Sequence, residues 1–267
     1  MIDPSARIAA GAVIGRNVSV GPYCTVGADV SLADDCRLVS HVNVAGHTAI
    51  GARTVVYPFA SLGTPPQSVK YRGGPTRLVI GADCDIREHV TVSVGTEDDR
   101  GVTEIGDGCF LMVGSHIGHD CKLGSKVIMS NNTLLAGHVS VGDNVLFGGG
   151  AAVRQFVRIG DGAMIVGLSG VRADIIPWGT VQGPLANLVG LNVVGMRRSG
   201  IAKSDVLALR RAYEMLFFGE GEFRARLQRV EAEFTSDQSV RKMIDFIRAG
   251  KRPLTMAIRR TQSDEDL

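Results

Sequence analysis

Aliphatic residues recur at every sixth position over most of the chain, and this spacing indicates the fold. One series runs without a gap from Ile2 to Leu62, a short one from Ile80 to Val92, and a third, one residue out of phase, from Ile105 to Val171. A fixed short period is typical of a stacked solenoid, in which each unit contacts only its neighbours. Six residues per face and three faces per turn predict a triangular parallel β-helix of 18-residue coils.

The residue after an aliphatic anchor is often glycine, as at Gly15, Gly21 and Gly106. Glycine tolerates the unusual dihedral angles of a sharp corner. We therefore expect these glycines to let the chain turn from one face of the prism to the next.

Two polar stretches interrupt the repeat, at about residues 64–77 and 93–103. We expect each to leave the prism as a loop and to return in register, where it can line a functional site. The β-helix is predicted to span residues 1–186, with its repeat ending at Pro177, Trp178 and Gly179.

Beyond residue 186 the hydrophobic period changes from six to about 3.6 residues, which is typical of helices. The sequence predicts helices over Lys203–Phe218, Phe223–Phe234 and Val240–Ile247, with Ser204 as a candidate N-cap of the first. Helices this short need a surface to pack on. Residues 187–267 are therefore predicted to form an α-helical domain docked on the prism.

Composition limits the kind of interior that the fold can have and the cellular compartment that suits it. Aromatic residues make up only 5% of the chain, which suits a narrow interior filled by stacked aliphatic side chains. No apolar run reaches 18 residues, so no transmembrane segment is expected, and Met1 enters the repeat at once, which leaves no room for a signal peptide. The five cysteines form no CxxC pair and share one phase of the repeat, as expected of buried core thiols in a reducing cytoplasm.

Charge is distributed unevenly along the chain. Residues 187–267 carry 15 Lys and Arg against 11 Asp and Glu, whereas residues 1–186 carry 14 against 16. A basic C-terminal segment suits an acidic partner or phosphate groups, although a solvated helical surface would give the same count. Nothing in the sequence indicates a nucleic-acid partner.

Three histidines carry the candidate chemistry. His119 lies one coil before Gly137, and His138 follows one position later, so both belong to one lateral face in coils about 4.8 Å apart. His116 lies three residues before His119, and we expect all three histidines to cluster at this face. A histidine followed by Asp120 can act as a general base oriented by a carboxylate, and the Gly137 N–H can bind a developing oxyanion.

Zinc binding is the competing interpretation of these histidines, because β-helix hydratases hold zinc with three imidazoles. Here the spacings are 3 and 19 residues, Asp120 abuts the central histidine, and His41, His47 and His89 lie elsewhere. We therefore expect neither a metal nor a cofactor.

Four motifs resemble one known family across the whole chain. They are VKYRGGPTR (69–77), SHIGHDC (115–121), NNTLLAGHVSVGD (131–143) and LVGLNVVGMRRSG (188–200). Together with the repeats, they make the chain similar to UDP-N-acetylglucosamine O-acyltransferase, which catalyses the first step of lipid A biosynthesis. The resemblance implies a left-handed β-helix, a homotrimer with active sites between subunits, a UDP-amino sugar and a 3-hydroxyacyl-acyl carrier protein as substrates, and a cytoplasmic location.

The resemblance also implies roles for particular residues. His119 would be the general base that deprotonates the sugar 3-hydroxyl, Asp120 would orient it, and the Gly137 N–H would receive the oxyanion. Gly167 would be the position that limits acyl-chain length. The residues that would bind substrate are Gln67, Lys70, His116, His138, Arg154, Asn192 and Arg198.

The chain departs from the family pattern at several positions near the expected acceptor sugar. Arg154 stands where relatives often have histidine, Ser68 where many have aspartate, and Val194 where an acidic residue is expected. SVGT (93–96), which includes Val94, replaces a more basic HRGT-like stretch. These departures leave open an acceptor with a 3-amino group, which would give an amide product.

Other functions remain as alternatives. The N-acyltransferase of the next acylation step shares the prism but needs a domain before the repeats, for which this sequence leaves no room. A coenzyme A-dependent acetyltransferase would not be expected to carry so long a helical tail. A purely structural prism gives no reason for the histidine cluster.

Overall fold

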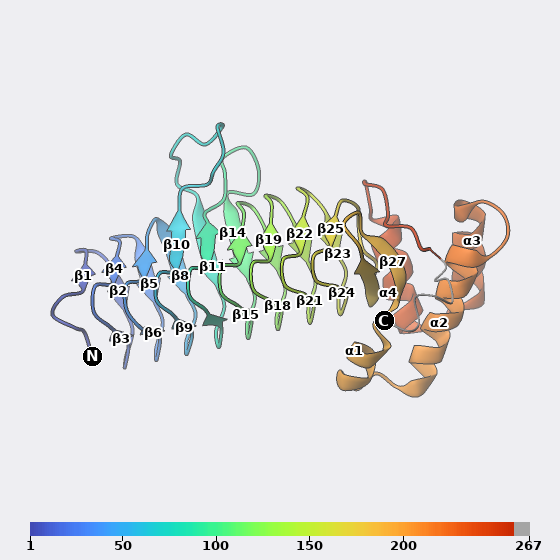
Figure 1. The fold of residues 1–267 in the computed structure, drawn as a ribbon, viewed down its shortest axis with the longest axis horizontal. Helices are drawn as coiled ribbons and strands as arrows, with labels where there is room; N and C mark the ends of the chain where they lie inside the picture. The colour runs from blue at the N-terminus through green and yellow to red at the C-terminus, as the bar shows by residue number, and fades with distance from the viewer. Residues whose placement is uncertain (259–267) are drawn as a thin grey trace.

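The computed structural model describes residues 1–258 of the 267-residue chain and consists of a prism followed by a group of helices. The prism is a left-handed parallel β-helix, as expected, and its hand departs from the right-handed crossover usual between parallel strands. Figure 1 shows the N-terminus at one end of the prism and the helices packed at the other.

Three sheets form the faces of the prism within residues 1–258. The first contains β1 (Arg7–Ile8), β4 (Thr25–Val26), β7 (Asn43–Val44), β10 (Ser61–Thr64), β13 (Thr91–Ser93), β16 (His116–Ile117), β19 (Leu134–Leu135), β22 (Ala152–Val153) and β25 (Gly170–Val171). The second contains β2 (Val13–Ile14), β5 (Val30–Leu32), β8 (His47–Ile50), β11 (Arg77–Ile80), β14 (Val102–Ile105), β17 (Lys122–Leu123), β20 (Ser140–Val141) and β23 (Arg158–Ile159). The third contains β3 (Ser19–Val20), β6 (Arg37–Leu38), β9 (Val55–Val56), β12 (Asp85–Ile86), β15 (Phe110–Leu111), β18 (Ile128–Met129), β21 (Leu146–Phe147), β24 (Met164–Ile165), β26 (Gly179–Gln182) and β27 (Asn187–Leu191).

The pairing register follows the predicted 18-residue coil. Arg7 pairs with Thr25 in the first sheet, and Lys122 pairs with Ser140 in the second. The aliphatic anchors fill the interior: from Val20 to Val171 each is at most 5% exposed. The five cysteines are free and buried in the same core, where burial raises the pKa of the Cys121 thiol to about 12.

The corners are built differently from the sequence expectation. The left-handed conformation falls mainly on non-glycine residues three positions after an anchor, such as Tyr23 (φ 58°) and Asp120 (φ 59°). Most of the glycines after the anchors are required instead by close packing between coils. A Cβ on Gly21 would lie 1.8 Å from the Val39 carbonyl oxygen. The expectation that these glycines supply the corner dihedrals was therefore wrong for most of them.

Both loops leave the prism at one edge, between the first and second sheets, which we call the loop corner. One loop joins β10 to β11 and the other joins β13 to β14, close to the predicted bounds of 64–77 and 93–103. Figure 1 shows them projecting side by side from the same edge of the prism. We call the edge between the third and first sheets the ring corner.

The end of the prism and the helices differ in detail from the prediction. β27 (Asn187–Leu191), in the segment expected to be helical, pairs antiparallel with β26 and closes the prism. The helices are α1 (Val193–Arg198), α2 (Lys203–Phe218), α3 (Phe223–Glu233) and α4 (Gln238–Arg248). The N-cap of α2 is Ala202, and Ser204 lies inside the helix, where its hydroxyl bonds Asp205 at 3.2 Å. Ser204 is therefore not the cap.

A buried ion pair joins the helices to the prism. The Arg158 guanidinium bonds Asp174, which is 1% exposed, at 2.7 Å, donates to the Phe246 carbonyl of α4 at 2.9 Å, and lies over the Phe246 ring. The arginine thus fixes α4 against the second sheet. Of the helices described, none is both long and apolar enough to cross a membrane.

Candidate active site

The loop corner holds the candidate catalytic residues in successive coils. His119 and Asp120 lie between β16 and β17, and Gly137 and His138 lie between β19 and β20. Phe156 occupies the same place in the next coil, so Asp120, His138 and Phe156 are stacked at one register position. All three have a positive φ, of 59°, 64° and 66°.

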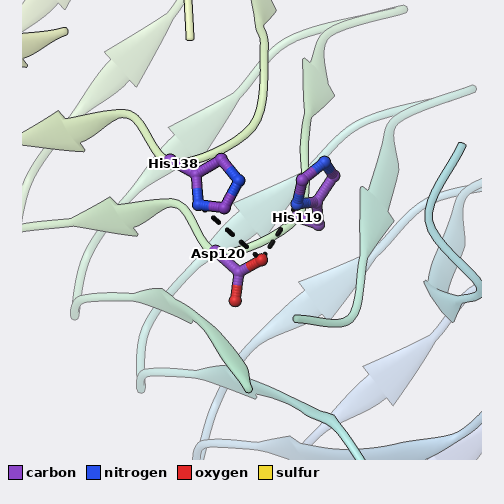
Figure 2. A group of neighbouring side chains, drawn as sticks. All are labelled: His119, Asp120 and His138. Atoms are coloured by element: carbon purple, nitrogen blue, oxygen red, sulfur yellow. Dashed lines mark hydrogen bonds and ion pairs between the residues drawn. The ribbon is translucent and has the colours of Figure 1, made fainter. Parts of the chain in front are cut away.

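His119 and Asp120 form a hydrogen-bonded pair. The His119 Nδ1 lies 2.9 Å from Asp120 Oδ2, and the side chains are 14% and 0% exposed. Figure 2 shows Asp120 between His119 and His138. Because Nδ1 faces the carboxylate, the Nε2 of His119 is the atom left to accept a proton from a substrate.

The Asp120 carboxylate is held by the second loop. It accepts hydrogen bonds from the Thr96 N–H at 3.0 and 3.1 Å and from the Thr96 hydroxyl at 2.6 Å. The backbone N–H of Asp120 donates to the Thr103 hydroxyl at 2.9 Å. A buried carboxylate needs such partners, and these fix the group that orients His119.

Gly137 lies directly against the His119 ring. A Cβ at Gly137 would be 2.6 Å from Cε1 and 2.7 Å from Nε2 of that ring. In the described part of the chain, the Gly137 N–H donates to no protein acceptor, whereas the neighbouring His138 N–H donates to the His119 carbonyl at 2.8 Å. The corner thus holds an unpaired donor beside an imidazole.

His138 has close neighbours on several sides. Its Nδ1 lies 2.5 Å from Asp99 Oδ2 and 3.9 Å from Asp120 Oδ2. Its ring stacks on Phe156, with centroids 4.2 Å apart and planes 5° from parallel, and meets the His119 ring edge-on at 4.8 Å.

His116, expected in one cluster with His119 and His138, bonds a different kind of partner. It lies on β16, and its Nδ1 is 2.8 Å from the Thr91 hydroxyl of the neighbouring coil. Burial, and to a smaller extent the charge of His119, lower the pKa of His116. It is therefore a neutral, partly buried neighbour of the His119 pair.

The same residues could hold a metal ion by spacing alone. One ligand atom from each of His119, Asp120 and His138 lies within 4.8 Å of the others. Both Asp120 oxygens, however, already accept hydrogen bonds from Thr96. The arrangement suits an oriented general base as it stands.

The first loop carries Gln67 and Lys70 on its surface. Both are exposed, and within the described residues neither contacts the histidines; the Lys70 N–H donates to the Ser68 hydroxyl at 3.3 Å. The two loops are joined by Glu97, whose carboxylate accepts from the N–H groups of Gly74 and Arg72. The pKa of Glu97 is lowered first by its own backbone N–H and then by those of Gly74 and Arg72.

Other predicted site residues are dispersed along the chain. Arg154 is exposed at the loop corner, two residues before Phe156. Asn192 caps α1, accepting from the Gly195 N–H at 2.8 Å and donating to the Gly162 carbonyl at 2.9 Å, and Arg198 lies in the last turn of the same helix. Figure 1 shows α1 on the side of the prism away from the loops. Val194 is exposed on α1.

Gly167 lies at the ring corner, between β24 and β25, and not at the loop corner. A Cβ there would be 3.1 Å from the Gly149 carbonyl oxygen, and the next residue, Leu168, is 79% exposed. The chain therefore places Gly167 and His119 on different edges of one prism.

Sequence reasoning did not identify Thr96, Glu97 and Asp99 as site residues. All three belong to the second loop, which was expected to line a site. The repeat gives no register inside a loop, so their partners could not be assigned. A run of hydroxyl and acidic side chains opposite two histidines was the available signal.

Comparison with known proteins first defines the class. A sequence model described as bacterial transferase hexapeptide (six repeats) matches residues 11–46 and 103–137. A second, described as UDP N-acetylglucosamine O-acyltransferase, domain 2, matches residues 174–255. The prism is thus that of a hexapeptide-repeat transferase, and the helical segment is specific to one branch.

Individual relatives define the branch. The chain is 55% identical over its full length, and over 98% of the relative, to acyl-(acyl-carrier-protein)–UDP-N-acetylglucosamine O-acyltransferase of Azorhizobium caulinodans. It is 44% identical to the Rhizobium johnstonii protein of that name, over 93% of this chain and 91% of the relative. The crystal structure of UDP-N-acetylglucosamine O-acyltransferase from Moraxella catarrhalis superposes with a TM-score of 0.92 at 38% identity, covering 95% and 99% of the two chains. The chain belongs to the UDP-N-acetylglucosamine O-acyltransferase family.

Proposed function

We propose that this protein transfers a 3-hydroxyacyl chain from acyl carrier protein to the 3-hydroxyl of UDP-N-acetylglucosamine, the first step of lipid A biosynthesis. The observation that carries the proposal is the His119 ring, bonded to buried Asp120 on one side and lying against Gly137 on the other. Relatives that match this chain along its length are named for that reaction.

His119 acts as the general base. Its Nε2 takes the proton of the sugar 3-hydroxyl while that oxygen attacks the thioester carbonyl carbon. The buried Asp120 carboxylate accepts a hydrogen bond from the Nδ1–H, which keeps the Nε2 lone pair free and stabilises the imidazolium that forms. When the C–S bond breaks, the same imidazolium returns the proton to the departing thiolate.

The oxyanion of the tetrahedral intermediate is bound by the Gly137 N–H. This donor has no protein acceptor in the described structure, and it lies in the same corner as His119. A preorganised donor of this kind is worth more in the transition state than in the ground state.

The sugar and the nucleotide of the acceptor are held by residues that one chain keeps apart. The sugar is bound by Gln67, Lys70, His116, His138 and Arg154. The nucleotide is bound by Asn192 and Arg198, and Arg198 pairs with the phosphates of the nucleotide. A homotrimer, in which α1 of one subunit faces the loop corner of another, would bring these groups together. The N-cap contacts of Asn192 leave it one amide hydrogen for a ligand.

The setting proposed for the reaction is the cytoplasm. Five free, buried thiols are suited to a reducing compartment. The basic C-terminal helices offer a surface for an acidic carrier protein.

Mass spectrometry of the product tests the proposal. The protein is incubated with 3-hydroxyacyl-acyl carrier protein and either UDP-N-acetylglucosamine or its 3-amino analogue, and acetyl-coenzyme A replaces the acyl donor in a third arm. Ester formation with the first acceptor supports the proposal. A protein that acylates only the 3-amino analogue, or that accepts only acetyl-coenzyme A as acyl donor, would refute the proposal.

Acyl length gives a second measurement. Gly167 presents no side chain, so the acyl groove stays open there, and each buried methylene contributes about 0.8 kcal/mol. Gly167→Met is expected to shift the preferred 3-hydroxyacyl chain to a shorter one. An active variant whose kcat/KM profile across chain lengths equals that of the wild type would remove Gly167 from this role.

A further inference from the structure

The second loop contributes a further carboxylate to the site, that of Asp99. Asp99 reaches across from the loop between β13 and β14 to His138, between β19 and β20, with its Oδ2 2.5 Å from Nδ1. The His138 side chain is 14% exposed and that of Asp99 is 41% exposed. The contact is therefore partly shielded from water, where a charge-assisted hydrogen bond is strongest.

The other contacts of His138 leave its ring little freedom. One face is covered by Phe156, which is itself backed by the Arg252 guanidinium 4.9 Å from its centroid. The edge toward His119 is set by the T-shaped contact at 4.8 Å. With Nδ1 bound to Asp99, the Nε2 of His138 is the ring nitrogen left for a ligand.

The loop is built to serve both histidines from one turn. The Asp99 N–H approaches the Thr96 carbonyl at 3.5 Å, so the two side chains project from a single tight turn. Thr96 binds Asp120, which orients His119, and Asp99 binds His138 directly.

We propose that Asp99 is a positioning residue that fixes the His138 ring, with its Nδ1 protonated and its Nε2 presented to the bound acceptor sugar. The inference rests on the proposed function and deepens it, because it assigns the orientation of a sugar-binding imidazole to a loop carboxylate. Asp99 itself does not contact the substrate.

Steady-state kinetics of loop variants test this role. Asp99→Ala is expected to raise the KM for UDP-N-acetylglucosamine about tenfold, as for loss of one charge-assisted hydrogen bond, with kcat changed less than about threefold. Asp99→Glu is expected to restore most of the lost affinity. Asp98→Ala is the matched control, because the described structure gives this exposed neighbour no hydrogen bond or ion pair, and its KM should equal that of the wild type.

The ¹⁵N resonances of His138 supply a readout that does not depend on turnover. The wild type should show a protonated Nδ1 that Asp99→Ala, and the isosteric Asp99→Asn, shift markedly, whereas Asp98→Ala leaves it unchanged. The assignment would be overturned if Asp99→Ala left the KM unchanged, or if the His138 resonances were the same in the wild type and in the Asp99 variants. A wild-type protein that acylates no UDP-sugar would refute the proposed function, and the resonances alone would then decide whether Asp99 positions His138.

Discussion

Two edges of the same prism carry imidazoles in the same backbone conformation, yet only at the loop corner do carboxylates bond these rings within the described residues. At the ring corner, Tyr23, His41, Phe59 and His89 form a column in successive coils, with ring centroids 5.0–5.2 Å apart. His41 (φ 52°) and His89 (φ 59°) match His138 (φ 64°) in backbone geometry. The two edges differ in what reaches the ring nitrogens.

At the ring corner the histidines contact other rings and are exposed to solvent. At the loop corner, Asp120 lies 2.9 Å from His119 and Asp99 lies 2.5 Å from His138. Both carboxylates depend on the second loop, since Thr96 holds one and the loop itself bears the other. An imidazole at a corner of the prism therefore remains a stacking group unless a carboxylate is fixed beside it, and at the loop corner the second loop does this, by holding Asp120 through Thr96 and by supplying Asp99.

The largest test of this contrast is removal of one imidazole from each edge. His119→Ala should lower kcat by about 10²–10⁴-fold, the usual contribution of a general base. His41→Ala at the ring corner should leave kcat close to that of the wild type. Comparable losses in both variants, or a His119→Ala variant that retains most of its kcat at pH 7, would contradict the division between the edges.

A methyl group at Gly137 tests the packing of the His119 imidazole, the proposed general base. Its Cβ would lie 2.6 Å from the His119 ring, so the ring must move. We expect Gly137→Ala to lower kcat by about 10²-fold, because small displacements of catalytic groups are costly. Gly27→Ala is the matched control, since its Cβ would meet nothing nearer than 3.5 Å. Similar kcat values for the two variants would show that the His119 position is not critical.

Thr96→Val tests the loop's hold on Asp120 without changing side-chain volume. The variant removes the 2.6 Å hydroxyl donor from a buried carboxylate, and bonds to charged groups contribute about 1.5–3 kcal/mol. We expect kcat to fall roughly tenfold and Thr96→Ser to restore it. If Thr96→Ser has a kcat as low as that of Thr96→Val, loss of the hydroxyl does not explain the fall in kcat.

The smallest expected effect is on the free energy of unfolding, and it depends on His116. Because the pKa of His116 is lowered in the folded protein, the unfolded chain binds a proton near pH 6.5 that the folded chain does not. The free energy of unfolding therefore falls as pH drops through this range. His116→Asn should weaken this dependence, measured by urea unfolding between pH 5 and 7.5 at one protein concentration. An identical slope in wild type and variant would contradict the assignment.

The sequence predicted the architecture because the architecture is periodic. Each anchor from Val20 to Val171 is buried where the six-residue count places it, and the loops leave where the count breaks. The same register placed His138 one position beyond Gly137, and the two candidate imidazoles do meet. Their catalytic and binding roles stay predictions.

Features without a period were not predictable in this way. Thr96 and Asp99 reach their partners through a loop, whose path depends on its own turns and not on the coil. The corner dihedrals were assigned to glycines because glycine favours positive φ, yet Asp120 and His138 adopt this conformation within the rigid stack. β27 was not predicted, because it pairs antiparallel with β26 at the end of the prism and so does not follow the six-residue repeat.

The fixed pairing register also makes distance along the prism a stepwise quantity. Every strand of the regular coils pairs with residues 18 positions away, and neighbouring strands are about 4.8 Å apart. Inserting or deleting one whole coil between His138 and the helices would preserve every face and corner while moving the helices by one such step. Within the regular coils, a change of another length would break the register of the faces that follow, whereas extra residues can leave the prism as a loop, as they do between β10 and β11. The distance between the histidines and the helical domain can thus change only by whole coils. Each coil that is added or removed changes this distance by the same step.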